Sequence, residues 1–445
     1  MKIKLQSILP YIIAIAIFAI ISMIYFSPVL EGNQLKQNDI THYRGMSKEV
    51  QDYKTLTGER ILWSNNMFSG MPSYQTSTVR DGNWLGSIGK LFRLYLPGPI
   101  GLLFTAMLGF YILCLCMKID PWLSILGALG FGLASFFFLY LNAGHATKMY
   151  ALAYIPPTVG GVLLVFRKKY ILGAALTALF LGLHIYSNHL QVTYYLLFLL
   201  LAIGITKGIV ALVQKDIVDF GKSALVLIAA GFIGLMPSMT NLLLTGEYSA
   251  YTTRGKTELT IDSNGEEKVE AKKEGLDRDY ILEYNIGKGE LLASFIPNAK
   301  GGSSGYLGYR KDGTKDSALL KTASPKNRDL IQRIGAMSYW GKQNGTAGAF
   351  YYGAIIILLF VIGMVVSKNQ IKWGLLVIFL MCCALALKES SLGDFFIENI
   401  PMYDKFRDSK MILMLVQVIL PLVAMLGINQ LIKDRESLKQ YRLPV

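Results

Sequence analysis

The chain has 445 residues, of which 53% are hydrophobic and only 17% are charged, and its mean hydropathy is +0.41. Soluble domains usually carry about 25% charged residues, so this composition argues against a soluble enzyme or a disordered chain. The net charge is +14. Such a basic balance fits nucleic-acid binding, an anionic membrane surface or the positive-inside bias of a membrane protein, and only the positions of the charges distinguish these.

The first apolar run, residues 8–30, carries no charge and follows Lys2 and Lys4. The apolar region of a signal peptide has only about 7–15 residues and ends at a small-residue cleavage site, so an uncleaved span is favoured here. Spanning a bilayer takes roughly 20 predominantly apolar residues. On that measure the sequence predicts about ten transmembrane helices, near residues 8–30, 99–117, 121–141, 149–166, 171–187, 190–206, 223–243, 347–367, 373–387 and 411–432.

The basic residues between these spans indicate the orientation. When the predicted spans alternate in direction, one side receives Lys2, Lys4, Lys118, Arg167-Lys168-Lys169, Lys207, Lys215, Lys368, Lys372 and the tail from Lys433 to Arg442. Cytoplasmic connections carry an excess of Lys and Arg, so this side and both termini are predicted to be cytoplasmic. The long connections then face outward as the first and fourth extracytoplasmic loops. Most of the basic charge thus indicates the orientation of the protein in a membrane and not a surface that binds nucleic acid.

Two local patterns describe the long outer loops. The segment SIGKLFRLYLPGPIGLL mixes Lys90 and Arg93 with apolar residues, as in a helix that lies in the membrane interface, although it could instead extend the next span. Asn264-Gly265 between two short polar runs predicts a β-hairpin. The predicted divisions are a first transmembrane helix (1–30), an outer loop with an interfacial helix (31–98), helices 2–7 (99–243), an outer loop with a hairpin (244–346), and helices 8–10 with a cytoplasmic tail (347–445).

The four histidines of the chain all fall on or near the outer side, and this clustering suggests a site there. They are His42, His145, His184 and His189. Asp39 follows the first span closely. A carboxylate held just above the membrane can bind a divalent cation or accept a proton from an attacking hydroxyl. The alternative is that Asp39 is an ordinary solvated carboxylate.

Basic residues near the outer ends of two spans are candidates for binding a donor phosphate. Lys148 lies three residues after His145, where it could neutralise a phosphate while His145 ligates a metal or positions the acceptor. Arg407 and Lys410 precede the last span, and an arginine suits bidentate phosphate contact. A snorkelling lysine with an interfacial histidine, and a surface basic cluster balanced by neighbouring aspartates, are the alternatives.

Further polar residues at the same level are predicted to line a cavity or contact the acceptor. They are His42, Tyr43, His189, Gln191 and Tyr194. The tyrosines could equally belong to the aromatic belt at the membrane interface. No GxxxxGK[ST], GxGxxG or HExxH motif accompanies them, so a nucleotide-dependent or zincin-type site is not indicated.

Several of these segments together resemble the bacterial YfhO-like membrane proteins. The resemblance runs along most of the chain and rests on Asp39, the WSNNMFSGMP segment with Gly70-Met71-Pro72, AGHATK with His145 and Lys148, NHLQVTYY, and YDKFRDSK with Arg407. Membership implies a GT-C-like fold, similar to polytopic glycosyltransferases that use polyprenyl-phosphate sugars. It also implies a bacterial plasma membrane protein whose active face is extracytoplasmic.

In such enzymes the first outer loop carries an essential acidic residue, and Asp39 is the position that looks like it. They often hold a divalent cation, Mg²⁺ or Mn²⁺, with this acid and a residue of the second outer loop, where this chain offers His145. A DxD-like acidic pair is missing from that second loop, which leaves metal dependence open. Family members commonly continue through more spans, so the chain is expected to be a shortened member or a fragment.

The resulting hypothesis is a membrane glycosyltransferase that transfers a sugar from a polyprenyl-phosphate carrier to an extracytoplasmic envelope glycopolymer or lipid. Nucleotide sugars are not available outside the cell, so the donor would be lipid-linked and its phosphate would be the leaving group. One alternative is a transporter or flippase of a lipid-linked substrate. The other is a non-catalytic envelope assembly protein that uses residues 244–346 for partner contacts. Under the glycosyltransferase hypothesis, the expected partners of the protein are the bilayer, the donor lipid and the acceptor. No nucleic acid is expected to bind.

Overall fold

A computed structural model describes residues 5–77, 80, 82–256, 261, 265–266, 274–306, 323–333, 337–343 and 350–434. The chain forms two compact units. Unit 1 comprises Met1–Gly275, Ile356–Phe379 and Met414–Val445, and unit 2 comprises Leu276–Ile355 and Leu380–Leu413. Each unit is described by itself.

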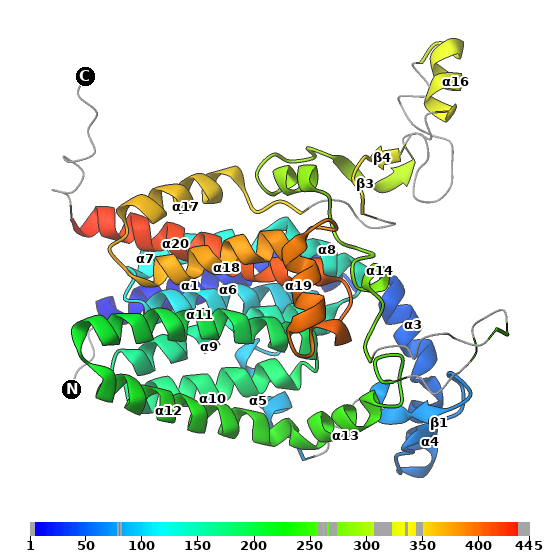
Figure 1. The fold of residues 1–445 in the computed structure, drawn as a ribbon, viewed down its shortest axis with the longest axis horizontal. Coiled ribbons are helices and arrows are strands. Elements are labelled where there is room, and N and C mark those ends of the chain that lie inside the picture. The colour runs from blue at the N-terminus through cyan, green and yellow to red at the C-terminus, as the bar shows by residue number, and fades with distance from the viewer. Residues whose placement is uncertain are drawn as a thin grey trace. The chain divides into compact units, whose positions relative to one another are not determined.

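Unit 1 is a helical bundle in which α6, α9, α10, α11 and α12 run side by side (Figure 1). A short strand pair, β1 (Trp63–Ser64) and β2 (Met71–Pro72), and two 3₁₀ turns, η1 (Ser73–Gln75) and η2 (Met236–Ser238), lie between its helices. The helices are α1 (Leu5–Tyr25), α2 (Ser27–Leu30), α3 (Asn38–Met46), α4 (Lys48–Thr57), α5 (Leu85–Phe92), α6 (Gly98–Cys116), α7 (Pro121–Gly132), α8 (Ser135–Ala143), α9 (Ala146–Phe166), α10 (Tyr170–Tyr186), α11 (Leu190–Gln214), α12 (Ile217–Leu235), α13 (Met239–Ser249), most of α17 (Ala354–Val366), the first part of α18 (Ile371–Leu385) and α20 (Met414–Lys433).

Many of these helices have the length and composition of membrane spans. Within the described ranges, six helical stretches are long and apolar enough to cross a bilayer, and α7 with α8 forms a seventh candidate bent by 44°. The other predicted spans correspond to the shorter apolar helices α10, α17 and α18, which have 17, 13 and 15 residues. The part of the chain that the structure describes is therefore largely helical, with six or seven helices that could span a membrane, as in an all-α polytopic membrane protein.

Sequence signals explain where the bundle helices begin and how closely they pack. The Asp120 side chain accepts hydrogen bonds from the backbone N–H groups of Trp122 and Leu123, so it caps α7, whose first residue is a proline. Between α9 and α10, a Cβ on Gly161 would lie 2.6 Å from the backbone nitrogen of Thr177. Small residues of this kind let membrane helices approach closely.

The basic connections of unit 1 meet at one end of the bundle. Lys433 donates to the carbonyl of Lys118 (3.0 Å), and Arg167 donates to that of Cys116 (2.5 Å). Lys368 pairs with Asp434 at 2.8 Å, next to Lys433. These residues are among those that the sequence predicts to share the cytoplasmic side, and the structure brings them together. The side of a membrane on which they lie stays a prediction.

The opposite end of the bundle carries α3, α4 and the β1–β2 pair (Figure 1). Helix α5 packs into the bundle near this end, where Leu85 joins Tyr154, Phe180 and Leu183 in a buried cluster. The chain turns after α5 before α6 begins at Gly98, so the segment that carries α5 does not extend the next span. The predicted place of α5 at a membrane interface is not tested by these contacts.

Unit 2 combines short helices with one strand pair. Strands β3 and β4 are antiparallel, with Gly301 opposite Tyr339. The predicted hairpin around Asn264-Gly265 lies largely outside the described residues. The elements of unit 2 are α14 (Arg278–Ile281), η3 (Lys288–Ser294), β3 (Gly301–Tyr306), α16 (Pro325–Arg333), β4 (Met337–Tyr339), the end of α18, α19 (Ser391–Asn399), η4 (Tyr403–Lys405) and η5 (Ser409–Leu413).

Candidate functional site

Asp39 lies in the first turn of α3, which is fixed to the bundle through its N-terminal side. The Gln37 side chain, just before α3, donates a hydrogen bond to the carbonyl of Leu141 near the end of α8. A carboxylate in the first turn of a helix also interacts favourably with the helix dipole. The start of α3 is thus held against the turn between α8 and α9.

Gly144 makes this close approach possible. It ends α8 with a φ of +101°, a left-handed conformation that glycine adopts without strain. A Cβ at this position would lie 3.2 Å from the Cβ of Asp39 and 3.2 Å from Ile40. Glycine at 144 therefore serves both the turn and the contact with α3.

Asp39, His145 and Lys148 form one polar cluster, the Asp39 cluster. The Nε2 atom of His145 is 2.5 Å from Oδ2 of Asp39, and Nζ of Lys148 is 3.3 Å from Nδ1 of His145. A neutral imidazole satisfies both contacts in one tautomer, in which Nε2–H donates to Asp39 and Nδ1 accepts from the Lys148 ammonium. The Asp39 side chain is 51% exposed, so solvent and ligands reach the carboxylate.

His189 lies next to this cluster, just before α11. Burial lowers its pKa to about 3, and the nearby Lys148 and His145 contribute to the same shift. His189 is therefore neutral at physiological pH. Its Nδ1 atom is buried without a hydrogen-bond partner among the described residues, which leaves a hydrogen-bonding position open beside the cluster.

A cavity of about 440 Å³ adjoins the Asp39 cluster, within the size range of small-molecule sites. It is bounded by the chain from α2 to α3, the start of α6 and the α8–α9 turn. Ile40 and Ala146, the neighbours of Asp39 and His145 in the sequence, contribute to its wall, and Leu102 and Leu141 make part of it apolar.

The charged groups that line this cavity are both basic. They are Lys36 and Arg44, and no acidic side chain is among the lining residues. Arg93 reaches the same wall because it donates a 2.7 Å hydrogen bond to the hydroxyl of Tyr150, which lines the cavity. The cavity therefore suits a ligand with an anionic group and an apolar part. Lys36 and Arg44 were not predicted from the sequence, although both flank Asp39 closely.

Other predicted residues near the cluster are engaged in packing. His184 bonds to the carbonyl of Ala151 at 2.8 Å and to the hydroxyl of Thr193 at 3.0 Å, and it is fully buried. Gln191 is buried and donates to the hydroxyl of Tyr195 at 2.8 Å. His184 accordingly joins three helices rather than facing a ligand.

Three predicted residues lie away from the cavity wall. His42 and Tyr43 follow Asp39 on α3 and are exposed, and the cavity is lined there by Ile40, Thr41 and Arg44 instead. The Tyr194 ring packs edge-on against Phe198, with 4.9 Å between the centroids. Their predicted role in acceptor binding is not tested by these contacts.

Arg407 and Lys410 belong to unit 2, where aromatic rings surround them. The Arg407 guanidinium donates to the Tyr280 hydroxyl and lies 4.8 Å from the Tyr280 ring centroid and 5.3 Å from that of Tyr284. The Lys410 ammonium lies 5.7 Å from the Tyr284 ring and 3.9 Å from Asp408. Cation–π contacts of this kind stabilise a folded cluster. Binding of a donor phosphate by these two residues stays a prediction.

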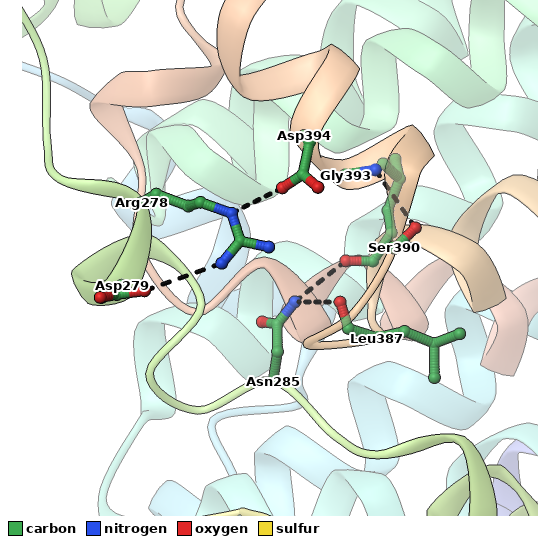
Figure 2. A network of polar contacts seen from close by, with 8 residues as sticks. Arg278, Asp279, Asn285, Leu387, Ser390, Gly393 and Asp394 are labelled. Atoms are coloured by element: carbon green, nitrogen blue, oxygen red, sulfur yellow. Dashed lines mark hydrogen bonds and ion pairs between the residues drawn. The ribbon is translucent and has the colours of Figure 1, made fainter.

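Asn285 anchors this part of unit 2. Its amide nitrogen donates to the carbonyls of Leu385 (3.1 Å) and Leu387 (3.3 Å), and its amide oxygen accepts from the backbone N–H of Lys410 (3.0 Å). Figure 2 shows this amide beside the ion pair of Arg278 with Asp394. Asn285 is not predicted from the sequence, since a single buried asparagine leaves no pattern there.

The predicted metal site depends on the donor atoms that Asp39 and His145 offer. Asp39 and His145 are paired directly with each other, and in the tautomer above Nε2 of His145 carries a proton instead of a free lone pair. Among the described residues, no group of three or more His, Cys, Asp or Glu side chains could hold a metal ion. In that tautomer both imidazole nitrogens of His145 have partners, so the pair offers a metal ion only the carboxylate oxygens of Asp39.

The chain matches no protein-family model, and neither a curated protein nor a solved structure is significantly similar to it.

Proposed function

We propose that the protein is a membrane glycosyltransferase that moves a sugar from a polyprenyl-phosphate carrier to an envelope glycopolymer or lipid. It would act at the extracytoplasmic face of a bacterial plasma membrane, with ten helices in a GT-C-like arrangement and both termini in the cytoplasm. One observation carries this proposal. An exposed carboxylate, Asp39, is paired with His145 at 2.5 Å beside a cavity whose lining includes apolar residues and two basic residues.

In the proposed reaction Asp39 is the general base. The acceptor hydroxyl attacks the anomeric carbon of the donor sugar, a new C–O bond forms, and the hydroxyl proton passes to the Asp39 carboxylate. The bond between the anomeric carbon and the phosphate oxygen breaks, and the lipid phosphate leaves with the electron pair. A positioned carboxylate typically contributes about 10²–10⁴-fold to such a proton transfer.

His145 and Lys148 keep Asp39 in position. The Nε2–H of His145 holds Oδ2 of the carboxylate, which leaves Oδ1 for the acceptor. The Lys148 ammonium, 3.3 Å from Nδ1, fixes the imidazole tautomer that can donate to Asp39. These two are positioning residues, because they act on the acceptor through the carboxylate.

The basic groups of the cavity are suited to the leaving phosphate. Lys36 and Arg44 line the cavity, and Arg93 reaches its wall through Tyr150. Pre-positioned cations stabilise the negative charge that grows on a departing phosphate. The apolar wall made by Leu102 and Leu141 fits the first isoprene units of a carrier lipid.

The test compares two carboxylate-to-amide variants of the first outer loop. Asp39→Asn removes the proposed base, whereas Asp52→Asn is a matched control, because the Asp52 side chain is 55% exposed and also sits in an ion pair on a helix. We expect Asp39→Asn to reach the membrane in normal amount and to lower transfer of radiolabelled sugar from its polyprenyl-phosphate carrier at least about 100-fold. Unchanged transfer in Asp39→Asn, or equal loss in both variants, would contradict the proposal.

A second function, transport of a lipid-linked substrate, is favoured by one observation. Helices α7 and α8 meet at a 44° bend around Leu133 and Ala134, and discontinuous helices often form transport sites in secondary transporters. Reconstituted protein that moves the lipid-linked sugar across the bilayer and transfers no sugar would establish this function instead.

A further inference from the structure

Unit 2 buries a carboxylate of which only one oxygen is hydrogen-bonded. Glu290 lies in η3 and is 2% exposed. Its Oε2 atom accepts hydrogen bonds from the backbone N–H groups of Gly287 (2.5 Å) and Lys342 (2.9 Å). Its Oε1 atom is buried and has no hydrogen-bond partner among the described residues. Because a buried charge is costly unless it is paired and fully hydrogen-bonded, Oε1 requires a further partner.

Two more buried oxygens of unit 2 share this property. The Tyr339 hydroxyl and the side-chain oxygen of Gln343 have no hydrogen-bond partner within the described ranges. Both residues are 6% exposed. Tyr339 ends β4, and Gln343 directly follows Lys342, whose N–H holds Glu290. Three unpaired oxygens thus come from two chain segments that this hydrogen bond joins.

Gly341 allows two of these oxygens to converge. A Cβ on this residue would lie 2.1 Å from the Tyr339 hydroxyl oxygen and 2.2 Å from Oε1 of Glu290, so any larger residue would collide with both. The two oxygens are therefore at most 4.3 Å apart, which is the sum of these distances. Ca²⁺ binds oxygens at about 2.3–2.6 Å, so two of its ligands can lie up to about 5 Å apart. The spacing fits two ligands of one such ion.

No basic side chain compensates the Glu290 carboxylate at contact distance. The buried Lys410 ammonium pairs with Asp408 at 3.9 Å, and its charge reaches Glu290 only over a longer distance. The Lys342 ammonium pairs instead with the exposed Glu389 at 2.5 Å. Glu290, Asp408 and Lys410 together carry one net negative charge. A bound cation would balance this charge.

The chemistry of the three unpaired atoms favours Ca²⁺ over other cations. All three are oxygens, from a carboxylate, a hydroxyl and an amide, whereas Zn²⁺ prefers nitrogen and sulfur ligands. Mg²⁺ usually keeps several of its waters, but Ca²⁺ accepts mainly protein oxygens in irregular arrangements. Because the site has a single carboxylate, we expect weak binding, with a dissociation constant of about 10⁻⁴–10⁻³ M.

We propose that Glu290 and Tyr339 bind one Ca²⁺ ion over Gly341. The side-chain oxygen of Gln343 is the third protein ligand, and backbone carbonyls or water supply the rest, as is usual for Ca²⁺. The ion ties η3 to the chain that follows β4. This site uses none of the residues of the Asp39 cluster, and the proposal does not depend on glycosyltransferase activity.

Hydrogen exchange of the full protein in detergent tests for the ion. Exchange is compared in about 10 mM Ca²⁺, in the same concentration of Mg²⁺ and in EDTA. A ligand that binds only the folded state at ten times its dissociation constant lowers the population of open states about tenfold. We expect slowing by this factor at residues 287–294 and 339–343 in Ca²⁺, and by less than about twofold in Mg²⁺. Exchange at residues 38–46 of unit 1 should not change.

Two carboxylate variants distinguish the site from a general effect of charge. Glu290→Gln keeps the shape of the side chain and removes its charge, whereas Glu389→Gln removes the exposed carboxylate that pairs with Lys342. The effect of Ca²⁺ should disappear in Glu290→Gln and persist in Glu389→Gln. Equilibrium dialysis with radioactive Ca²⁺ should likewise show one bound ion per chain that is lost only in Glu290→Gln.

A milder variant keeps the test decisive if Glu290→Gln fails to fold. Tyr339→Phe removes only a hydroxyl oxygen, and it should raise the dissociation constant for Ca²⁺ at least about threefold, since the ligand set tunes Ca²⁺ affinity. Equal exchange in Ca²⁺ and EDTA overturns the proposal in favour of a water molecule that bridges these oxygens. An effect of equal size in Mg²⁺, in Glu290→Gln or in Tyr339→Phe also overturns it.

Discussion

The protein contains two cation-rich clusters that look alike in the sequence and differ in the structure. The Asp39 cluster of unit 1 joins Lys148 and His145 to a carboxylate that is 51% exposed, next to a cavity with basic walls. In unit 2, Arg407 lies against two tyrosine rings, and Lys410 is only 7% exposed. The first cluster leaves a carboxylate open to solvent, whereas the second buries Lys410 and packs the half-buried Arg407 against tyrosine rings.

This difference distinguishes side chains that can act on a ligand from side chains that stabilise the fold. A side chain that acts on a ligand must keep an accessible atom, and Asp39 keeps Oδ1 while His145 holds Oδ2. A cation that packs against aromatic rings of the same fold is stabilised by those rings, so it needs no ligand as a partner. We therefore expect substitutions in the Asp39 cluster to change activity and substitutions in the cluster of unit 2 to change stability.

After Asp39→Asn, the largest expected effect is that of His145→Ala on sugar transfer. Without the imidazole, Asp39 loses the donor that orients it, and Lys148 loses its acceptor. We expect transfer of labelled sugar to fall about 100-fold, with the thermal unfolding temperature in detergent little changed. His145→Gln can still donate to Asp39 and should recover part of the activity.

Two results would contradict a positioning role for His145. Full activity in His145→Ala would show that Asp39 needs no orientation. A large drop in the unfolding temperature, without recovery of activity in His145→Gln, would show that the histidine serves the fold.

The next effect is a loss of stability in unit 2 on Asn285→Ala. Asn285 is fully buried, and its removal leaves the carbonyls of Leu385 and Leu387 and the N–H of Lys410 without their partner. Each unpaired buried group costs about 1–3 kcal/mol, so the loss of all three partners should lower the stability of unit 2 by about 3 kcal/mol or more. Hydrogen exchange should rise at residues 276–290 and 385–413 and stay unchanged at residues 38–46. Unchanged exchange in unit 2 would refute the anchoring role.

A third prediction concerns pH and His189. Burial lowers its pKa to about 3 in the folded protein, whereas an unfolded histidine has a pKa of about 6.5. Between these values the unfolded chain binds more protons, so stability falls as the pH decreases from about 6.5 toward 3. The His189 contribution is at most about 1.4 kcal/mol per pH unit. His189→Asn should therefore flatten the dependence of the unfolding temperature on pH between 6.5 and 5.

The control for this prediction removes an exposed histidine. His42 on α3 is exposed, so His42→Asn makes the same histidine-to-asparagine change away from a buried position. Equal slopes in His189→Asn and in the unmodified protein would show that His189 is protonated in the folded state.

Much of the fold could be predicted because apolar length is a local property of the sequence. The first span, residues 8–30, and the last, 411–432, correspond to α1 and α20. The count of ten spans is less secure, since α17 has only 13 residues and α18 only 15. The bend between α7 and α8 was missed, because residues 121–141 read as one apolar run without a proline or charge at the break.

The site could be predicted in part, because residue type and position along the chain can also be read directly from the sequence. Asp39, His145 and Lys148 were identified from residue type and position, and the structure brings all three together. Gly144 and Arg44 were missed, because their importance comes from the approach of α3 to the α8–α9 turn. That approach joins segments about a hundred residues apart, and single-sequence patterns carry no information on contacts of this range.

The smallest expected effect lies in the network of Figure 2, beside Asn285. The Arg278 side chain pairs with Asp394 at 2.6 Å, but the two side chains are 47% and 40% exposed. Exposed ion pairs of this kind contribute only about 0–1 kcal/mol, and salt weakens them. Asp394→Asn should therefore lower the stability of unit 2 by less than about 1 kcal/mol. This difference in stability should shrink in 1 M salt, because salt screens the attraction between the two charges. A loss as large as that of Asn285→Ala, and insensitive to salt, would mean that the charged pair rather than the buried amide holds this part of unit 2 together.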